Sequence, residues 1–301
     1  MKTKRNLFIA SILTLLLVSG ISSCTKTPAT AQNNNEFNVT ASFYPQYIML
    51  LNITQDVPDV KVSLLAPANT GCLHDYQMTT RDMKLIQDTD LLIINGAGME
   101  HFMESSLQTK NPEKIISVTD NYPLLEGNPH IWVSPLGAIY QTEQIAQALA
   151  KADSDNADLY LANCRKYTEK LASLYKTMQT ELKDYADIPI ITFHEAFPYF
   201  AKDFSLDLIG TIQNEHGQEP SAKELADIIN RIFSMQKENK TPVLFSEEDS
   251  HSSAAQIISA ETGLPVFYLD PAATGPLSLD AYILTMQKNT ETLKKALSNA
   301  R

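Results

Sequence analysis

Seven short apolar runs rich in β-branched residues recur along this 301-residue chain, with stretches of helical character between them. They are KVSLL (61–65), LLIIN (91–95), KIISV (114–118), IPIITF (188–193), DLIGTI (207–212), PVLFS (242–246) and PVFYL (265–269). Continuously apolar strands are typical of parallel sheets that helices cover on both faces. The sequence therefore predicts an α/β fold.

One segment between the two groups of strands has a different character. No proline or glycine occurs between residues 154 and 185, and apolar residues recur there at steps of three and four: Tyr167, Leu171, Leu174, Met178, Leu182 and Tyr185. This spacing predicts an amphipathic helix of about 30 residues, about 45 Å long. Such a helix would join two α/β lobes as a stiff spine and permit only small movements between them.

The N-terminus carries the features of a bacterial lipoprotein signal. A basic start, MKTKR, precedes an apolar run over 7–18 that is too short to span a bilayer comfortably. The run ends in ISSC, which resembles a lipobox with its cysteine at Cys24; the alternative is an ordinary secretory signal with a chance cysteine. We expect a signal peptide over 1–23, lipid attachment through Cys24 at the extracytoplasmic face of the cell membrane, and a flexible polar tether over 24–36.

Charge and cysteine content exclude several classes of protein. The full chain has 24 basic and 35 acidic residues. Removal of residues 1–23 takes away three bases and no acids, so the mature chain would hold 21 bases, 35 acids and a net charge of −14. This balance disfavours nucleic acid as a partner and favours cations. Only Cys72 and Cys164 follow Cys24, too few for a disulfide framework or a four-cysteine zinc site.

Possible metal ligands stand where the predicted strands end. His194 and Glu195 directly follow the run 188–193, Asp270 follows the run 265–269, and His74 comes nine residues after Leu65. Ligands of parallel α/β sheets bind beyond the carboxyl ends of the strands. His130, in GNPHIWVSP, is expected at the same edge of its sheet, although a lone histidine is more often structural. Three imidazoles and one carboxylate would suit tetrahedral Zn²⁺, but ligands from distant loops have no fixed spacing, so the pattern alone does not decide.

Four segments, GCLHDYQ, NPHIWVSP, FHEAFPYFAKDFSL and VFYLDP, give the chain a family likeness. These segments occur in the order and approximate spacing of one family. From about residue 37 to the C-terminus, the chain resembles the metal-binding lipoproteins of bacterial zinc and manganese ABC importers, the ZnuA/TroA-like cluster. The resemblance implies one metal in the cleft between two lobes, 37–150 and 187–301, which a linking helix over 151–186 joins. The implied ligands are His74 and His130 from the first lobe and His194 and Asp270 from the second, with Trp132 and Glu195 in supporting positions beside them.

The resemblance also implies a function. The chain would capture Zn²⁺ with high affinity and deliver it, as a monomer, to the membrane permease and ATPase of an ABC importer. A closed four-ligand shell leaves no place for an activated water, so we expect no enzymatic activity. The alternatives are a manganese-binding importer component, a surface adhesin with a bound metal, and a metallohydrolase that uses Asp270 or Glu195 as its base.

The donor set favours zinc over manganese. Three imidazoles with one carboxylate suit Zn²⁺, whereas a second carboxylate would move the site toward Mn²⁺. His194 stands where manganese-binding members of the cluster have a glutamate. Asn128 and Ser134 stand where members of this cluster often have aspartates around the second histidine, and both changes alter the charge around the ligands. Gln77 stands where many members have a glutamate after the first histidine.

The remaining candidate residues have plainer interpretations. His101, His216 and His251 are expected on the surface or in loops, although His216 could make a transient cation contact. Cys72 and Cys164 are expected to be small packing residues, with Cys72 a conceivable ligand because it lies two residues before His74. GAGMEH (96–101) is expected to form a tight turn after a strand, and Gly263 to end a helix.

Overall fold

Two four-stranded sheets organise the chain, as a computed structural model that describes residues 36–73, 76–108, 110–213, 220–247 and 252–300 shows. The strand order of the first sheet is β2 (Val60–Leu64), β1 (Phe37–Ala41), β3 (Leu91–Ile94), β4 (Ile115–Ser117). The order of the second is β6 (Asp207–Gln213), β5 (Pro189–His194), β7 (Val243–Glu247), β8 (Val266–Leu269). All neighbouring strands are parallel, which confirms the predicted fold class.

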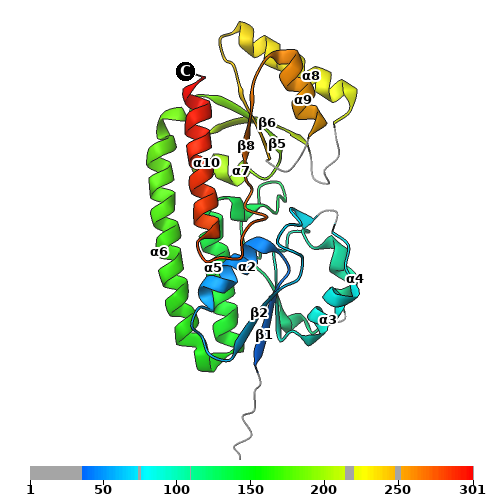
Figure 1. Cartoon of the computed structure of the whole chain (residues 1–301), viewed down its shortest axis with the longest axis vertical. Coiled ribbons are helices and arrows are strands. Elements are labelled where there is room, and N and C mark those ends of the chain that lie inside the picture. Colours follow the sequence, from blue (N-terminus) through cyan, green and yellow to red (C-terminus); the bar gives the residue numbers. More distant parts are fainter. Residues whose placement is uncertain (1–35, 74–75, 109, 214–219, 248–251, 301) are drawn as a thin grey trace, which may run out of the picture. The chain divides into compact units, whose positions relative to one another are not determined.

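Helices cover both faces of each sheet (Figure 1). The first sheet lies between α2 (Tyr44–Ile53) with α5 (Pro135–Ala152) and α3 (Thr80–Asp88) with α4 (Glu104–Leu107). The second lies between α7 (Pro198–Asp203) with α10 (Ala281–Ser298) and α8 (Ala222–Lys237) with α9 (Ser253–Thr262). Short 3₁₀ helices occur at His101–Met103, Pro112–Lys114, Ile131–Val133, Ser154–Asn156 and Lys183–Tyr185. None of the described helices is long and apolar enough to cross a membrane.

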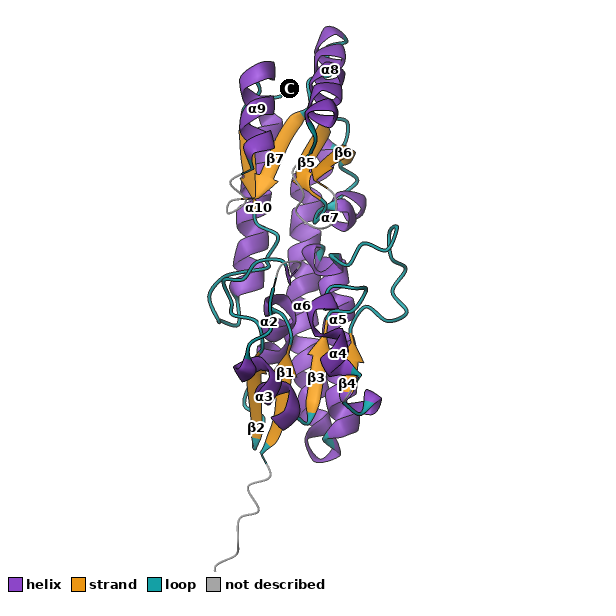
Figure 2. Cartoon of the chain, turned by 90° about the vertical axis from the view of Figure 1, so that its right-hand side faces the viewer, coloured by secondary structure: helices purple, strands orange, loops and turns teal. Residues whose placement is uncertain are grey.

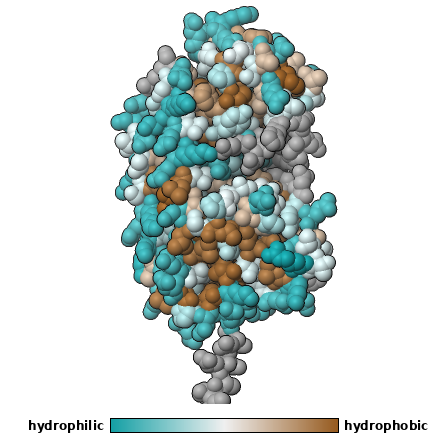
Figure 3. Space-filling model, viewed as in Figure 1, coloured by the Kyte–Doolittle hydropathy of each residue, from teal (hydrophilic) through white to brown (hydrophobic). Residues whose placement is uncertain are grey.

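The long helix predicted between the lobes is present as α6 (Ala157–Leu182), with a 3₁₀ turn at each end. Its apolar stripe is buried, whereas the side that faces away from the core is predominantly hydrophilic (Figure 3). α5 and α10 pack alongside it (Figure 1). The last helix of the chain therefore strengthens the spine of the molecule.

One apolar core runs along this spine through both lobes. It includes Leu50 from α2, Leu171 from α6, Phe245 from β7 and Leu293 from α10, each no more than 1% exposed. Two smaller clusters lie under α3 and under α8 with α9. A continuous core opposes a hinge motion, because separating the lobes along α6 would expose apolar surface to water.

The connector from β8 to α10, residues 271–280, is bonded to the first lobe. Four hydrogen bonds of 2.8 to 3.3 Å join them: Trp132 Nε1 to the Pro271 carbonyl, Gly275 N to the Ala68 carbonyl, Tyr44 Oη to the Pro276 carbonyl and Asn52 Nδ2 to the Leu279 carbonyl. The chain thus crosses between the lobes a second time immediately after Asp270.

Most local predictions agree with the structure, and one strand was missed. The central strand β1, FNVTA, has only short apolar stretches between polar residues, so its burial depends on β2 and β3 on either side. The predicted turn after β3 is present, with φ of +84° at both Gly96 and Gly98. A Cβ on Gly96 would lie 2.1 Å from Ser117 Oγ, so this position requires glycine. Gly263 ends α9 in the left-handed conformation, as predicted.

Candidate metal centre

The carboxyl ends of the two parallel sheets face one another. The arrowheads of β3 and β4 point toward the second lobe, and that of β7 points toward the first (Figure 2). Loops that follow strands in either lobe therefore meet between the lobes, where side chains from distant parts of the chain come together. His194 ends β5, Asp270 follows β8, and His130 lies in the loop between β4 and α5.

His194 is held by a carboxylate on the neighbouring strand. Its Nδ1 lies 2.5 Å from Oε1 of Glu247, the last residue of β7, and its side chain is 11% exposed. Burial works to lower the pKa of His194, but the hydrogen bond and charge of Glu247 and the charge of Glu195 outweigh it and raise the pKa above the usual histidine value. Glu247 was not among the residues predicted for the site, although a carboxylate at the end of a central strand is a signal that could have identified it.

His130 is fully buried and is held by Asn128. Oδ1 of Asn128 accepts from the His130 main-chain N at 2.9 Å and lies 3.1 Å from His130 Nδ1. Nδ2 of Asn128 donates to the Glu195 carbonyl at 2.8 Å, which fixes the orientation of the amide and leaves its oxygen toward the histidine. The asparagine noted in the sequence as a departure from the family thus orients one candidate ligand and contacts the other lobe.

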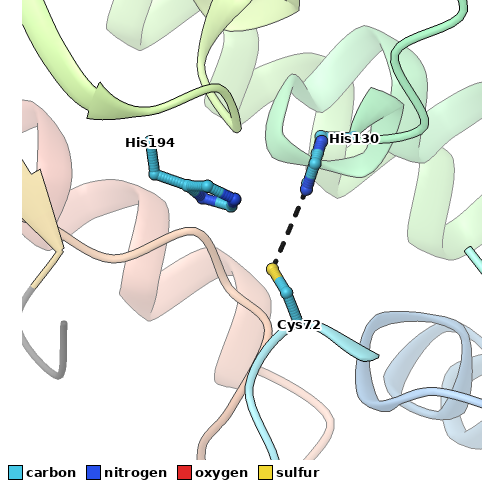
Figure 4. A group of neighbouring side chains, drawn as sticks. All are labelled: Cys72, His130 and His194. Carbon is cyan, nitrogen blue, oxygen red and sulfur yellow. Dashed lines mark hydrogen bonds between the residues drawn. The ribbon is translucent and has the colours of Figure 1, made fainter. Parts of the chain in front are cut away.

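These contacts select the tautomers of both imidazoles. Each Nδ1 faces an oxygen acceptor, Asn128 Oδ1 for His130 and Glu247 Oε1 for His194, so in the neutral rings Nδ1 carries the proton. Nε2 of each ring then keeps the lone pair that a metal ion requires. The rings approach edge to face with centroids 5.0 Å apart (Figure 4).

Cys72 completes a cluster of potential donors. Its Sγ lies 3.8 Å from His130 Nε2, and one donor atom each of Cys72, His130 and His194 lie within 4.8 Å of one another. Burial, followed by the charges of Glu247 and Glu195, raises the pKa of the Cys72 thiol well above its ordinary value, so the metal-free thiol is protonated at neutral pH. Cys72 packs against the core, as expected, and the loop after β2 also turns its side chain toward both histidines (Figure 4).

Of the other predicted site residues, the structure describes Asp270, whereas His74 and Cys24 lie outside the described residues. Asp270 follows β8, where Asn289 of α10 bonds its main-chain N and O at 2.9 and 2.7 Å. Its Oδ1 accepts from Ala272 N at 2.8 Å, and in the described part of the chain it lies outside the three-residue cluster. Its charge, together with the larger effect of burial, raises the pKa of Tyr44 to about 12.

Trp132 and Glu195 both lie beside the histidines. The Trp132 ring is fully buried, with its centroid 5.1 Å from that of His130 and 5.1 Å from that of Phe43. Glu195 falls in the turn just after β5, so it does not alternate away from His194 as a strand residue would. Its carboxylate is close enough to act on the pKa of both His194 and Cys72.

The remaining histidines and cysteine lie apart from this cluster. His101 is exposed and pairs with Glu104, with Nδ1 and Oε1 2.6 Å apart. Cys164 is buried on α6 and contacts the Thr142 carbonyl, in agreement with a packing role. His216 and His251 fall outside the described residues.

A sequence profile described as ZnuA, "zinc-uptake complex component A periplasmic", matches residues 39–296. The chain belongs to the ZnuA family. The match covers the spine helix, every described residue of the candidate site and both sheets except the first two residues of β1. The family is one of uptake components rather than of enzymes.

Relatives of this ZnuA-family chain carry different metals in their names. The high-affinity zinc uptake system protein ZnuA of Bacillus subtilis is 29% identical over 318 residues, covering 97% of each protein. The iron-binding protein YfeA of Yersinia pestis is 29% identical over 303 residues, covering 93% of this chain and 94% of the relative. The solved structure of the SBP FpvC from Pseudomonas aeruginosa with Mn²⁺ has a TM-score of 0.79 and 28% identity, and covers 88% of this chain and 100% of that one.

Proposed function

We propose that this ZnuA-family chain is a lipid-anchored, extracytoplasmic binding protein that captures Zn²⁺ between its lobes and delivers it to the permease and ATPase of an ABC importer. One observation carries the proposal. His130 from the first lobe and His194 from the second approach with ring centroids 5.0 Å apart, and an oxygen acceptor at each Nδ1 favours the tautomer in which Nε2 is the metal-binding nitrogen.

The proposed shell is His74, His130, His194 and Asp270. His74 follows the described loop that brings Cys72 to His130, so its sequence position suits a ligand from the same loop. Asp270 immediately precedes the connector that is bonded to the first lobe, where it would close the shell from the second lobe. Four protein donors leave no open position for a reactive water, which favours binding and transport over catalysis.

Zinc suits these donors better than manganese. Neutral imidazoles are borderline ligands that bind Zn²⁺ well, whereas Mn²⁺ prefers carboxylate and water oxygens. The carboxylate of Glu247 is engaged with His194 Nδ1, where it strengthens the imidazole as a ligand. A manganese importer of the same fold is the alternative.

The ISSC segment supports the proposed lipid anchor, and the family resemblance supports the proposed monomer. Cys24 would carry the lipid, and residues 24–36 would let the folded chain move above the membrane and reach its permease as a monomer. An additional role as a surface adhesin stays an untested prediction.

Metal content tests the proposal directly. The chain, purified without chelator, is analysed by elemental mass spectrometry beside His194→Ala, with His101→Ala as the matched control because that histidine is exposed and pairs with Glu104. We expect one zinc per chain in the parent and the control, and loss or strong weakening in His194→Ala. Stoichiometric manganese would support the alternative metal. No metal, and no uptake on titration, would contradict the proposed function.

A further inference from the structure

The thiol of Cys72 has the position of a metal donor. Its Sγ lies 3.8 Å from Nε2 of His130, whose other ring nitrogen, Nδ1, lies against Oδ1 of Asn128. One donor atom each from Cys72, His130 and His194 fits within 4.8 Å (Figure 4). The cluster joins one thiol to two imidazoles across the lobes.

The separation of sulfur and nitrogen matches a shared ion. Zinc binds thiolate at about 2.3 Å and imidazole at about 2.0 to 2.1 Å, so a tetrahedral angle places the two ligand atoms about 3.6 Å apart. The observed distance of 3.8 Å between Cys72 Sγ and His130 Nε2 exceeds this separation by about 0.2 Å, which is within the tolerance expected for distances in a metal site. A single ion could therefore contact both atoms after a very small movement.

Cys164 shows what a packing cysteine looks like in the same protein. It is buried on α6, and its Sγ contacts the Thr142 carbonyl at 3.9 Å, within the apolar core. Cys72 packs against the same core, but it is only partly buried and lies in the loop after β2, at the edge of the sheet where the candidate ligands meet. Substitution of Cys164 is therefore a suitable control for substitution of Cys72.

We propose that Cys72 binds the captured ion as a thiolate beside His130 and His194, and that this sulfur donor makes the site prefer Zn²⁺ and other thiophilic ions to Mn²⁺. The inference rests on the proposed function and gives the same site a fifth protein donor beside the four of the proposed shell, so the site still offers no open position to a reactive water. On binding, the sulfur–metal bond forms and the thiol proton leaves to solvent, because a coordinating thiol is deprotonated by the ion. Thiolate selects for Zn²⁺, whereas Mn²⁺ prefers oxygen donors.

Cobalt substitution reports the sulfur bond directly. Co²⁺ is added to the metal-free full chain, and its near-ultraviolet and visible absorption is recorded for the parent, Cys72→Ser and Cys164→Ser. We expect an intense sulfur-to-cobalt charge-transfer band in the parent and in Cys164→Ser. Cys72→Ser should bind one Co²⁺ through the remaining ligands without that band.

Competition between metals reports selectivity. With Zn²⁺ and Mn²⁺ titrated against the same three proteins, we expect Cys72→Ser to lose about tenfold or more of the preference for zinc, within the range usual for groups around a metal. Cys164→Ser should keep the parental preference.

Alkylation of the parent protein tests the same bond without a substitution. Bound zinc should slow the modification of Cys72 at least tenfold relative to the metal-free protein, because it lowers the fraction of Cys72 thiol that can react by about the same factor.

The outcomes separate this inference from the proposed function. Parental binding of zinc and cobalt without a charge-transfer band would overturn the role of Cys72 and leave the importer proposal intact. A band of equal strength in Cys72→Ser, or an unchanged preference for zinc, would do the same. Failure of the parent to bind either ion would overturn both proposals.

Discussion

Asn128 Nδ2 donates a 2.8 Å hydrogen bond to the main-chain carbonyl of Glu195. This bond joins the loop that carries His130 to the strand end that carries His194, and the other end of the same amide accepts from His130. Orientation of one candidate ligand is thereby coupled to the position of the other lobe. Tyr199 reinforces the contact by donating to the Asn128 carbonyl and accepting from Leu125 N.

Replacement of Asn128 should weaken metal binding. Asn128→Ala removes the acceptor at His130 Nδ1 and the bond to Glu195 together, so we expect zinc affinity to fall about 10- to 100-fold, as is usual when a partner of a metal-binding histidine is lost. Tyr199→Phe is the matched control, because it removes contacts between the lobes and leaves the side-chain contact with His130 in place. Isothermal titration with a competing chelator measures both; equal affinities in parent and Asn128→Ala would contradict the coupling.

Glu247 should set the pH dependence of metal binding. Zinc requires neutral His194, and Glu247 raises the pKa of that imidazole by stabilising its charged form, despite the opposing effect of burial. As the pH decreases, zinc affinity should therefore begin to fall at a higher pH than it would if His194 had an ordinary histidine pKa. Glu247→Gln should move this loss to lower pH, and also weaken binding at high pH because the imidazole becomes a poorer ligand. An unshifted pH profile would exclude this role of Glu247.

The pair of His194 and Glu247 should also stabilise the metal-free fold, and this stabilisation should be greatest at low pH, where metal binding is weakest. Since the folded pKa of His194 exceeds its unfolded value, protonation favours the folded state. This stabilisation is complete below the unfolded pKa and is lost as the pH rises through the folded pKa. Urea unfolding of the metal-free chain across this range should show the decline in the parent and a smaller decline in Glu247→Gln.

Gly137 should tolerate no side chain. A Cβ there would lie 1.9 Å from the Ile131 carbonyl oxygen, which is main chain and cannot rotate away. Because the clash must move the start of α5 against the 3₁₀ turn that follows His130, we expect Gly137→Ala to lower the free energy of unfolding by about 1 to 3 kcal/mol. Gly210→Ala is the control, since its nearest neighbour is a flexible arginine nitrogen at 3.8 Å. Comparable stability of the two variants in urea would be the contrary result.

Tyr44 should hold the connector 271–280 against the first lobe. Its hydroxyl donates to the Pro276 carbonyl at 2.9 Å, so Tyr44→Phe should cost about 1 kcal/mol of stability and speed hydrogen exchange at Gly275, whose N–H bonds to Ala68. Tyr185→Phe, which removes an exposed bond to Ser298, should change neither measurement appreciably. Unaltered exchange at Gly275 would show that the connector does not depend on Tyr44.

Much of the fold could be predicted because its signals are local. Apolar runs marked seven of the eight strands of the described chain, and the steps of three and four between Tyr167 and Leu182 marked α6. Strand and helix periodicity come from backbone geometry, which acts between residues a few positions apart. β1 was missed because its position between β2 and β3, rather than its own composition, accounts for its burial.

Sequence by itself determined the fold class, the spine and, through strand ends and family motifs, His130 and His194 as candidate ligands. Only the tertiary structure decided what surrounds them: Glu247 against one imidazole, Asn128 against the other, and Cys72 between the two lobes. Cys72 and His130 are 58 positions apart, and no interval along the chain encodes their contact. That contact exists because parallel strands place their carboxyl ends at one edge, and the spine holds two such edges face to face.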